Sequence, residues 1–144
     1  MKSLPFVLLM MLTVTLAACG SSRIPIGELS VAATDIAYDT HRFEVLAGQP
    51  VKLTLNNKGA LVHDFSILEM PHIGEVIAEE MENEVANHDM SHLSVDPEIH
   101  VASAMGESHS IEFTPSTPGE YEFFCTVVGH KEAGMVGTLV VKAP

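Results

Sequence analysis

The feature that most restricts the fold of this chain is a series of short runs in which apolar residues recur at every second position. In the run PVKLTLNN, at 50–57, Val51, Leu53 and Leu55 fall on one side and polar residues on the other. This is the period of a half-buried β-strand, and the turn-forming stretches AGQP and NKGA flank it. Comparable apolar or β-branched runs lie at 29–39, 42–47, 62–68, 109–115, 120–125 and 137–143. Several short strands between Gly and Pro turns predict an all-β sandwich.

The stretch from 69 to 106 departs from this pattern and is not strand-like. It is crowded with Glu, His and Met and contains the segment NHDMSH. Its apolar residues Val76, Ile77 and Met81 are compatible with one or two helical turns. The length and polarity of the stretch favour instead a long insertion on the surface of the sandwich, between the strand at 62–68 and the later strands.

The imidazoles and thioethers in and near this insertion raise the question of a second metal site. Imidazole and thioether groups are both copper ligands, and thioethers prefer Cu(I). The first candidates are His88, Met90 and His92. Their irregular spacing favours the alternative, a solvated acidic loop whose methionines pack on the sandwich. The full set is His72, His88, His92, His100, His109, Met70, Met81, Met90 and Met105.

The first 18 residues, MKSLPFVLLMMLTVTLAA, have the pattern of an export signal. Lys2 provides a positive start, and the apolar run that follows is too short to indicate a membrane span. The next residues complete LAAC at 16–19, which resembles the lipobox of bacterial lipoproteins. That resemblance implies cleavage before Cys19 and a lipid on its sulfur, with 19–28 as a tether. An ordinary signal peptide with a chance Cys, or a simple hydrophobic anchor, are the alternatives.

The charge and cysteine content restrict the partners and the compartment. The net charge is −12 at pH 7, and a chain this acidic does not favour contact with nucleic acid or anionic lipid. Without the signal, the remaining length fits one domain. Export implies an oxidising compartment, in which disulfides are allowed. If Cys19 carries lipid, Cys125 has no partner within the chain, and a lone Cys in an exported protein needs an explanation.

Cys125 lies in a loop that contains two further soft or borderline ligands. The loop CTVVGHKEAGM has the spacing C-x₄-H-x₄-M, which places His130 and Met135 between two strand-like runs. A thiolate, two imidazoles and a weak thioether form the trigonal arrangement of blue-copper electron-transfer sites. That arrangement requires a second histidine, and His63 in GALVHDFSI, at the start of a strand, can provide it.

These segments resemble the cupredoxin family of small blue-copper proteins over about residues 30–143. FEVLAGQPVKLTLNNKGALVHDFSI is similar to the half of the family with the first ligand, and IEFTPSTPGEYEFFCTVVGHKEAGMVGTLVV is similar to the Cys-loop half. The ligand loop is more similar to those of rusticyanin, auracyanin and sulfocyanin than to that of plastocyanin. The resemblance implies a Greek-key β-sandwich domain at 29–144 with one type 1 copper near one end. It implies His63, Cys125 and His130 as equatorial ligands and Met135 as the axial ligand.

One residue departs from the family pattern. Members often carry Asn or Ser directly after the first histidine, where the side chain ties the two ligand loops together, whereas this chain has Asp64. An ionised Asp can accept the same type of hydrogen bond but cannot donate one. A carboxylate near copper would favour Cu(II), so the reduction potential is open to second-shell tuning by this residue.

The resemblance implies a membrane-tethered electron carrier that exchanges single electrons with redox proteins in the periplasm or outside the cell. We expect a monomer whose acidic surface steers it to basic docking patches. The alternative is a copper carrier or delivery protein that uses the His/Met-rich insertion. We do not expect an enzyme, because copper oxidases and nitrite reductases need patterns such as His-x-His that this sequence lacks.

Overall fold

The computed structural model describes residues 25–79 and 90–144. These residues form ten strands and no helix. The strands are β1 (Gly27–Thr34), β2 (Ala37–Tyr38), β3 (Arg42–Leu46), β4 (Val51–Asn57), β5 (His63–Ile67), β6 (Ile77–Ala78), β7 (Ile99–Ser103), β8 (Ser108–Phe113), β9 (Gly119–Phe124) and β10 (Val136–Lys142). Within the described ranges there is therefore no helix long and apolar enough to cross a bilayer.

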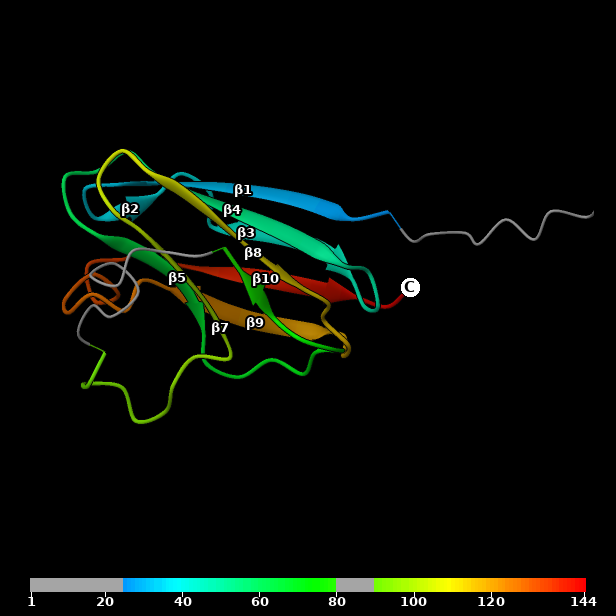
Figure 1. Cartoon of the computed structure of the whole chain (residues 1–144). Helices are drawn as coiled ribbons and strands as arrows, with labels where there is room; N and C mark the ends of the chain where they lie inside the picture. Colours follow the sequence, from blue (N-terminus) through cyan, green and yellow to red (C-terminus); the bar gives the residue numbers. More distant parts are fainter. Residues whose placement is uncertain (1–24, 80–89) are drawn as a thin grey trace, which may run out of the picture.

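The strands form two five-stranded sheets that face each other (Figure 1). The order is β2-β1-β4-β8-β6 in the first sheet and β3-β10-β9-β5-β7 in the second. Pairing is parallel between β1 and β4 and between β3 and β10, and the other strand pairs are antiparallel. The all-β, Greek-key sandwich expected from the sequence is confirmed.

The core lies between the sheets and follows the alternation of the strands. In β4, Val51, Leu53 and Leu55 are at most 1% exposed, whereas the residues between them are half-buried. From the second sheet, Phe65 of β5 and Phe123 of β9 stack with their ring centroids 4.5 Å apart. Burial of these apolar side chains is the main favourable contribution to folding, and it holds β5 and β9 next to each other.

The expectation that 69–106 lacks strands is wrong at two places. β7 pairs antiparallel with β5, and its Ile99 and Val101 are fully buried. β6 pairs with β8, so Ile77 lies in a short strand and not in the helical turn with which its sequence is also compatible. The two-residue spacing of Ile99 and Val101 is a strand signal, hidden by the polar residues around it. Met81, the third apolar residue of that alternative, lies outside the described residues.

The two ends of the described chain lie at the same end of the sandwich. The beginning of β1 and the C-terminus lie together, and the loop between β9 and β10 lies at the opposite end (Figure 1). The expected signal at 1–18, Cys19 and most of the tether lie outside the described residues. The domain boundaries therefore stay predictions.

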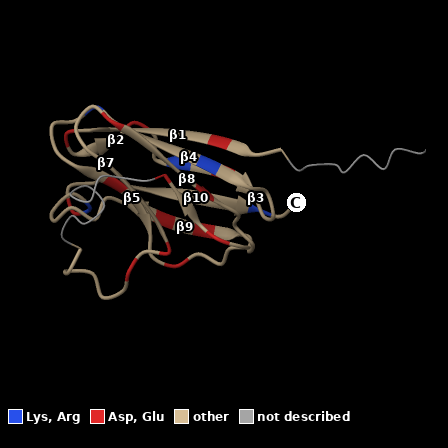
Figure 2. Ribbon diagram, in the orientation of Figure 1, with Lys and Arg blue, Asp and Glu red and all other residues tan. Residues whose placement is uncertain are grey.

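Asp and Glu positions outnumber Lys and Arg positions along the described chain (Figure 2). Several of those basic side chains contact carboxylates. The pairs are Arg42–Glu120, Lys52–Glu79, Lys131–Glu122 and Lys142–Glu44. All four are exposed pairs, which contribute little to stability. Their consequence is that much of the positive charge is already balanced, which leaves a surplus of negative charge on the surface.

Candidate metal centre

Three of the residues expected to bind copper lie together at one end of the second sheet. His63 is the first residue of β5, Cys125 directly follows β9, and His130 lies in the loop between β9 and β10. Cys125 Sγ is 3.9 Å from His63 Nδ1 and 3.5 Å from His130 Nδ1. One ligand atom from each residue lies within 4.8 Å of the others. All three side chains are buried, with exposed fractions of 0%, 1% and 5% for His63, Cys125 and His130.

Met135 is held beside this cluster by backbone hydrogen bonds. The amide of Met135 donates to the carbonyl of His130 at 2.9 Å, and the amide of Cys125 donates to the carbonyl of Met135 at 3.1 Å. The Met135 side chain is fully buried. These two hydrogen bonds hold the backbone of Met135 next to the backbone of Cys125 and His130.

Glycines make the sharp turns of this loop possible. Gly129 has φ of 86° and Gly134 has φ of 104°, a region that side chains with a Cβ rarely adopt. Each glycine directly precedes a candidate ligand, since His130 follows Gly129 and Met135 follows Gly134. The Gly-His and Gly-Met pairs in the sequence are thus the local reason why both side chains turn inward.

Asp64 ties β5 to the loop between β9 and β10, residues 125–135, which we call the Cys loop. The register of the two strands sets Ser66 opposite Phe124, and the same register places Asp64 opposite Thr126. Asp64 Oδ1 accepts a hydrogen bond from the Thr126 amide at 2.8 Å, and Oδ2 accepts one from the Thr126 hydroxyl. The tie between the two ligand segments that was expected of Asp64 is therefore present, with the carboxylate as the acceptor.

Two further contacts of Asp64 were not foreseen from the sequence. Its Oδ1 also accepts from the hydroxyl of Ser66 at 3.2 Å, and its backbone carbonyl accepts from the hydroxyl of Tyr38. Tyr38 comes from β2 of the first sheet, so this contact joins the two sheets beside the cluster. A signal for the Ser66 contact exists in the sequence, because residues two apart on a strand share a face. No signal points to Tyr38.

Burial dominates the ionisation of the cluster. It raises the pKa of the Cys125 thiol to about 12, and the charge of Asp64 adds to the effect, while backbone amides of Asp64 and Val127 that hydrogen-bond the sulfur oppose it. Burial also lowers the pKa of His63, with a further contribution from His130, and lowers the pKa of His130 itself. At neutral pH the metal-free thiol is therefore protonated, so binding of a metal as thiolate releases a proton.

The donor set fits copper. Both imidazoles direct Nδ1 to the thiol sulfur. The two nitrogens and the sulfur form an N₂S donor set of the kind that binds copper. The outer nitrogen of His63, Nε2, is buried without a hydrogen-bond partner among the described residues. The ring of His63 packs so closely on Gly59 that a Cβ there would lie 2.8 Å from Nε2. The backbone around this imidazole therefore fixes its orientation.

In residues 25–79 and 90–144, the histidines of the expected insertion do not form a second group of candidate ligands. Within the described ranges, His63, Cys125 and His130 are the one group of three or more His, Cys or acidic residues close enough to share a metal ion. The histidines outside it make other contacts, such as His100 Nδ1 with Ser66 at 2.9 Å. Met70 is a core residue, and Met105 is 68% exposed. His88 lies outside the described residues.

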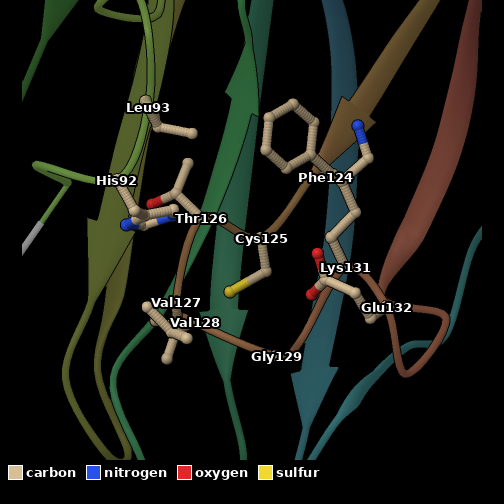
Figure 3. A pocket seen from close by; sticks show the side chains of 10 residues that line it. All are labelled: His92, Leu93, Phe124, Cys125, Thr126, Val127, Val128, Gly129, Lys131 and Glu132. Carbon is tan, nitrogen blue, oxygen red and sulfur yellow. The ribbon is translucent and has the colours of Figure 1, made fainter.

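Of the residues proposed for a second metal site, His92 lies near Cys125. It lines a cavity of about 270 Å³, with His92 and Leu93 on one side and residues of the Cys loop, including Cys125, on the other (Figure 3). Apolar walls come from Leu93 and Val127, and Lys131 stands on the opposite side from His92. An imidazole thus stands at a surface pocket that reaches the residue carrying the thiol.

Comparison with known proteins agrees with this geometry. The model of the copper-binding proteins of the plastocyanin/azurin family matches residues 26–142. The sandwich is similar to reduced auracyanin from Roseiflexus castenholzii, with 25% identity, a TM-score of 0.59, and 80% of this chain and 96% of that one covered. It is also similar to auracyanin A from Chloroflexus aurantiacus, with 21% identity, a TM-score of 0.57, and 82% and 100% covered.

Two curated relatives share the description copper-resistant cuproprotein CopI. The protein from Rubrivivax gelatinosus is 37% identical over 109 residues, which cover 72% of this chain and 62% of the relative. The protein from Pseudomonas aeruginosa is 29% identical over 138 residues, which cover 80% of this chain and 76% of the relative. The chain thus spans less than two thirds of the length of the first relative.

The fold and the buried His, Cys and His cluster define a copper-binding β-sandwich of the cupredoxin class. The chain belongs to the plastocyanin/azurin family of copper-binding proteins. The copper expected from the sequence is therefore confirmed as the cofactor of this class of protein.

Proposed function

We propose that His63, Cys125 and His130 bind one type 1 copper ion as equatorial ligands, with Met135 as the axial ligand, and that the protein carries single electrons. The observation that supports this most is the convergence of two imidazole Nδ1 atoms and one thiol sulfur within 4.8 Å in a buried site. The four residues come from a strand start and one closed loop. No enzymatic activity is part of the proposal.

The surroundings of the site suit repeated electron transfer. Copper, when bound, supplies a one-electron couple between Cu(II) and Cu(I). The backbone bonds of the loop and the Asp64–Thr126 hydrogen bonds hold the side chains in one arrangement for both states, and small rearrangement favours fast transfer. Burial keeps bulk water from the thiolate. His130, with 5% exposed, is the most exposed of the three residues and is the proposed route for the electron to the surface.

The proposed partners are redox proteins outside the cytoplasm with basic docking patches. The acidic surplus of the surface supports this choice, because complementary charge increases association rates at low salt. A lipid on Cys19 would tether the protein, as a monomer, to a bacterial membrane. The described chain begins at the end of the sandwich opposite the Cys loop (Figure 1), and this placement would direct the copper site away from the membrane.

A visible spectrum tests the proposed centre. Residues 20–144 would be expressed, loaded with Cu(II) and compared with Cys125→Ser. We expect an intense thiolate-to-copper charge-transfer band in the wild type and none in the variant. Copper bound with a pale spectrum that is unchanged in Cys125→Ser would refute the type 1 site. Ser108→Ala, a substitution of an exposed residue of β8, is the control variant. It shows whether a substitution away from the site alters copper loading or the spectrum.

A second candidate function is copper handling, in which the protein passes copper to or from a partner. It is favoured by the description of the two relatives as copper-resistant cuproproteins and by His92 at the cavity beside Cys125. A copper carrier should exchange its metal, whereas an electron carrier should retain it through redox cycles.

Copper transfer to a chelator separates the two functions. Under copper handling, His92→Ala slows transfer from the loaded protein at least several-fold without a change in the charge-transfer band. Equal transfer rates for wild type and variant, with copper retained over many reduction and oxidation cycles, would leave electron transfer as the function. His109→Ala, in which the lost imidazole contacts Ser103, is the matched control.

A further inference from the structure

The end of the sandwich opposite the Cys loop is built from segments without Asp, Glu, Lys or Arg. These segments are PI at 25–26, LAGQP at 46–50, PHIG at 71–74 and TPSTP at 114–118. Lys142 lies close to them at the end of β10, and its charge is paired with that of Glu44. Because the whole chain has a net charge of −12, the lack of carboxylates in all four segments distinguishes this end from the rest of the molecule.

Backbone hydrogen bonds hold these segments side by side. The carbonyl of Pro50 accepts from the amide of the first residue of β1 at 2.8 Å, and the Gly48 amide donates to the carbonyl of Pro115 at 2.8 Å. The Ile73 amide donates to the carbonyl of Thr114, also at 2.8 Å. The four segments therefore form one surface around the beginning of β1, where the C-terminus also lies (Figure 1).

Large apolar side chains are exposed on this surface. Ile26, Leu46 and Ile73 are 52%, 43% and 58% exposed. Several such side chains on one uncharged end form an apolar patch, and patches of this kind mark contact with another protein or with a membrane. Apolar residues are exposed at the copper end as well. Met105 is one of them, since the residue after it donates to the carbonyl of Asn57 at the far end of β4.

The start of the chain decides which of the two ends meets a membrane. Five residues, 20–24, separate Cys19 from Pro25. Six steps of at most about 3.5 Å each reach about 20 Å. If Cys19 carries a lipid, the uncharged end must therefore stay within that distance of the bilayer surface, whereas the copper end is held further away by the length of the strands.

We propose that the uncharged end contacts the surface of a lipid bilayer through Ile26, Leu46 and Ile73, so that the strands run away from the membrane. The inference rests on the lipid anchor of the proposed function. The anchor alone permits many orientations, whereas this second contact selects one. β1 has eight residues, about 26 Å in length. The candidate metal ligands would therefore face away from the bilayer, where a redox partner can reach them.

Fluorescence of an introduced Trp tests the contact, because the chain has no Trp of its own. The full chain with Ile73→Trp would be produced in a bacterium, checked by mass spectrometry for a lipid on Cys19, and placed in phosphatidylcholine vesicles. These vesicles carry no net charge, so the acidic protein is not repelled. We expect emission at shorter wavelength than in detergent-free buffer, and a several-fold loss of emission when the acyl chains are brominated. Leu46→Trp provides the same measurement if Ile73→Trp does not fold.

Met105→Trp is the matched control, because it places the probe on an exposed residue at the copper end. Its emission should be equal in brominated and ordinary vesicles. Ile26→Glu, combined with Ile73→Trp, should restore most of the lost emission, because a carboxylate resists transfer out of water. Ile36→Glu, in the exposed turn between β1 and β2 at the copper end, should not restore it.

The proposal is overturned if the lipidated Ile73→Trp chain emits equally in both kinds of vesicle, or if Met105→Trp is quenched to the same extent. Emission at shorter wavelength without quenching by bromine would also overturn it, because a second copy of the chain rather than lipid would then cover this end. A mature chain without lipid in the mass spectrum would refute the anchor and this proposal together. The charge-transfer band tests the copper centre independently of all these results.

Discussion

Gly59 offers a direct test of how the packing around His63 positions the imidazole. A Cβ at this position would lie 2.8 Å from His63 Nε2, 3.2 Å from its Cδ2 and 2.9 Å from the backbone nitrogen of Asp35. Ordinary van der Waals contacts of a Cβ begin at 3.4 Å. The backbone of Asp35 cannot move easily, so Gly59→Ala should push the imidazole ring away from its present place. Its backbone is not left-handed, and the substitution acts through these contacts alone.

The expected cost is that of overpacking a well-packed core, about 1–3 kcal/mol. For a domain of this size, this corresponds to a decrease in Tm of roughly 4–12 °C for the metal-free protein. A displaced His63 should also weaken copper binding. The increase in Tm on addition of Cu(II), which reflects binding to the native state, should therefore be smaller in the variant than in the wild type. Thermal unfolding followed by circular dichroism, with and without copper, measures both effects.

Gly27→Ala is the matched control. Its Cβ would meet only the side chain of Gln49, at 3.4 Å and beyond, and the substitution restricts the unfolded chain in the same way. We expect Gly27→Ala to unfold within a few degrees of the wild type and to keep the full response to copper. If Gly59→Ala matched this control in both Tm and copper response, the reasoning that Gly59 is required for the placement of His63 would be refuted.

Three other predictions concern the core, the loop and the thiol. Phe123→Ala removes a fully buried ring stacked on Phe65 and should cost about 3–5 kcal/mol in urea unfolding; a loss below about 1 kcal/mol would contradict its place in the core. Thr126→Val removes a hydroxyl donor to the buried Asp64 and should cost about 1–3 kcal/mol in the same assay, whereas no loss would show that the hydrogen bond does not stabilise the loop. Finally, burial raises the pKa of Cys125 from 9.0 to about 12. The neutral thiol therefore contributes fully to the free energy of unfolding of the metal-free protein below pH 9. As the pH rises from 9 to 12, the free energy of unfolding should fall by up to about 4 kcal/mol. Cys125→Ser should lack this loss, and identical pH profiles of the two proteins would contradict the pKa.

Strand alternation predicted most of the sandwich but not β7. The buried positions of β4 follow its sequence, because a strand with one face on the core shows its burial directly as a period of two. In β7, Ile99 and Val101 have the same spacing, but the run is short and lies beside many polar residues. What makes it a strand is the pairing with β5, a long-range interaction that the local sequence does not contain.

The Cys loop was predictable because its information is local. Cys125, His130 and Met135 lie within eleven residues of sequence, and Gly129 and Gly134 mark the turns that direct them. Apart from His130, six other histidines could have supplied the second imidazole, and the choice of His63 rested on its place at a strand start together with the family resemblance. Neither the local sequence nor the resemblance predicted the contact of Asp64 with Tyr38, because it joins residues of opposite sheets.

The sequence by itself determined the strand pattern, the acidic charge and the set of ligand types, since these follow from residue identity and spacing. The tertiary structure decided which imidazole joins the thiol. Cys125 and His63 are 62 residues apart in sequence, and they meet because β5 and β9 pair antiparallel in one sheet. The same pairing buries Asp64 between the ligand segments. Burial is a property of the packed sheets, and it places a carboxylate that would be solvated in an open strand beside the candidate metal ligands.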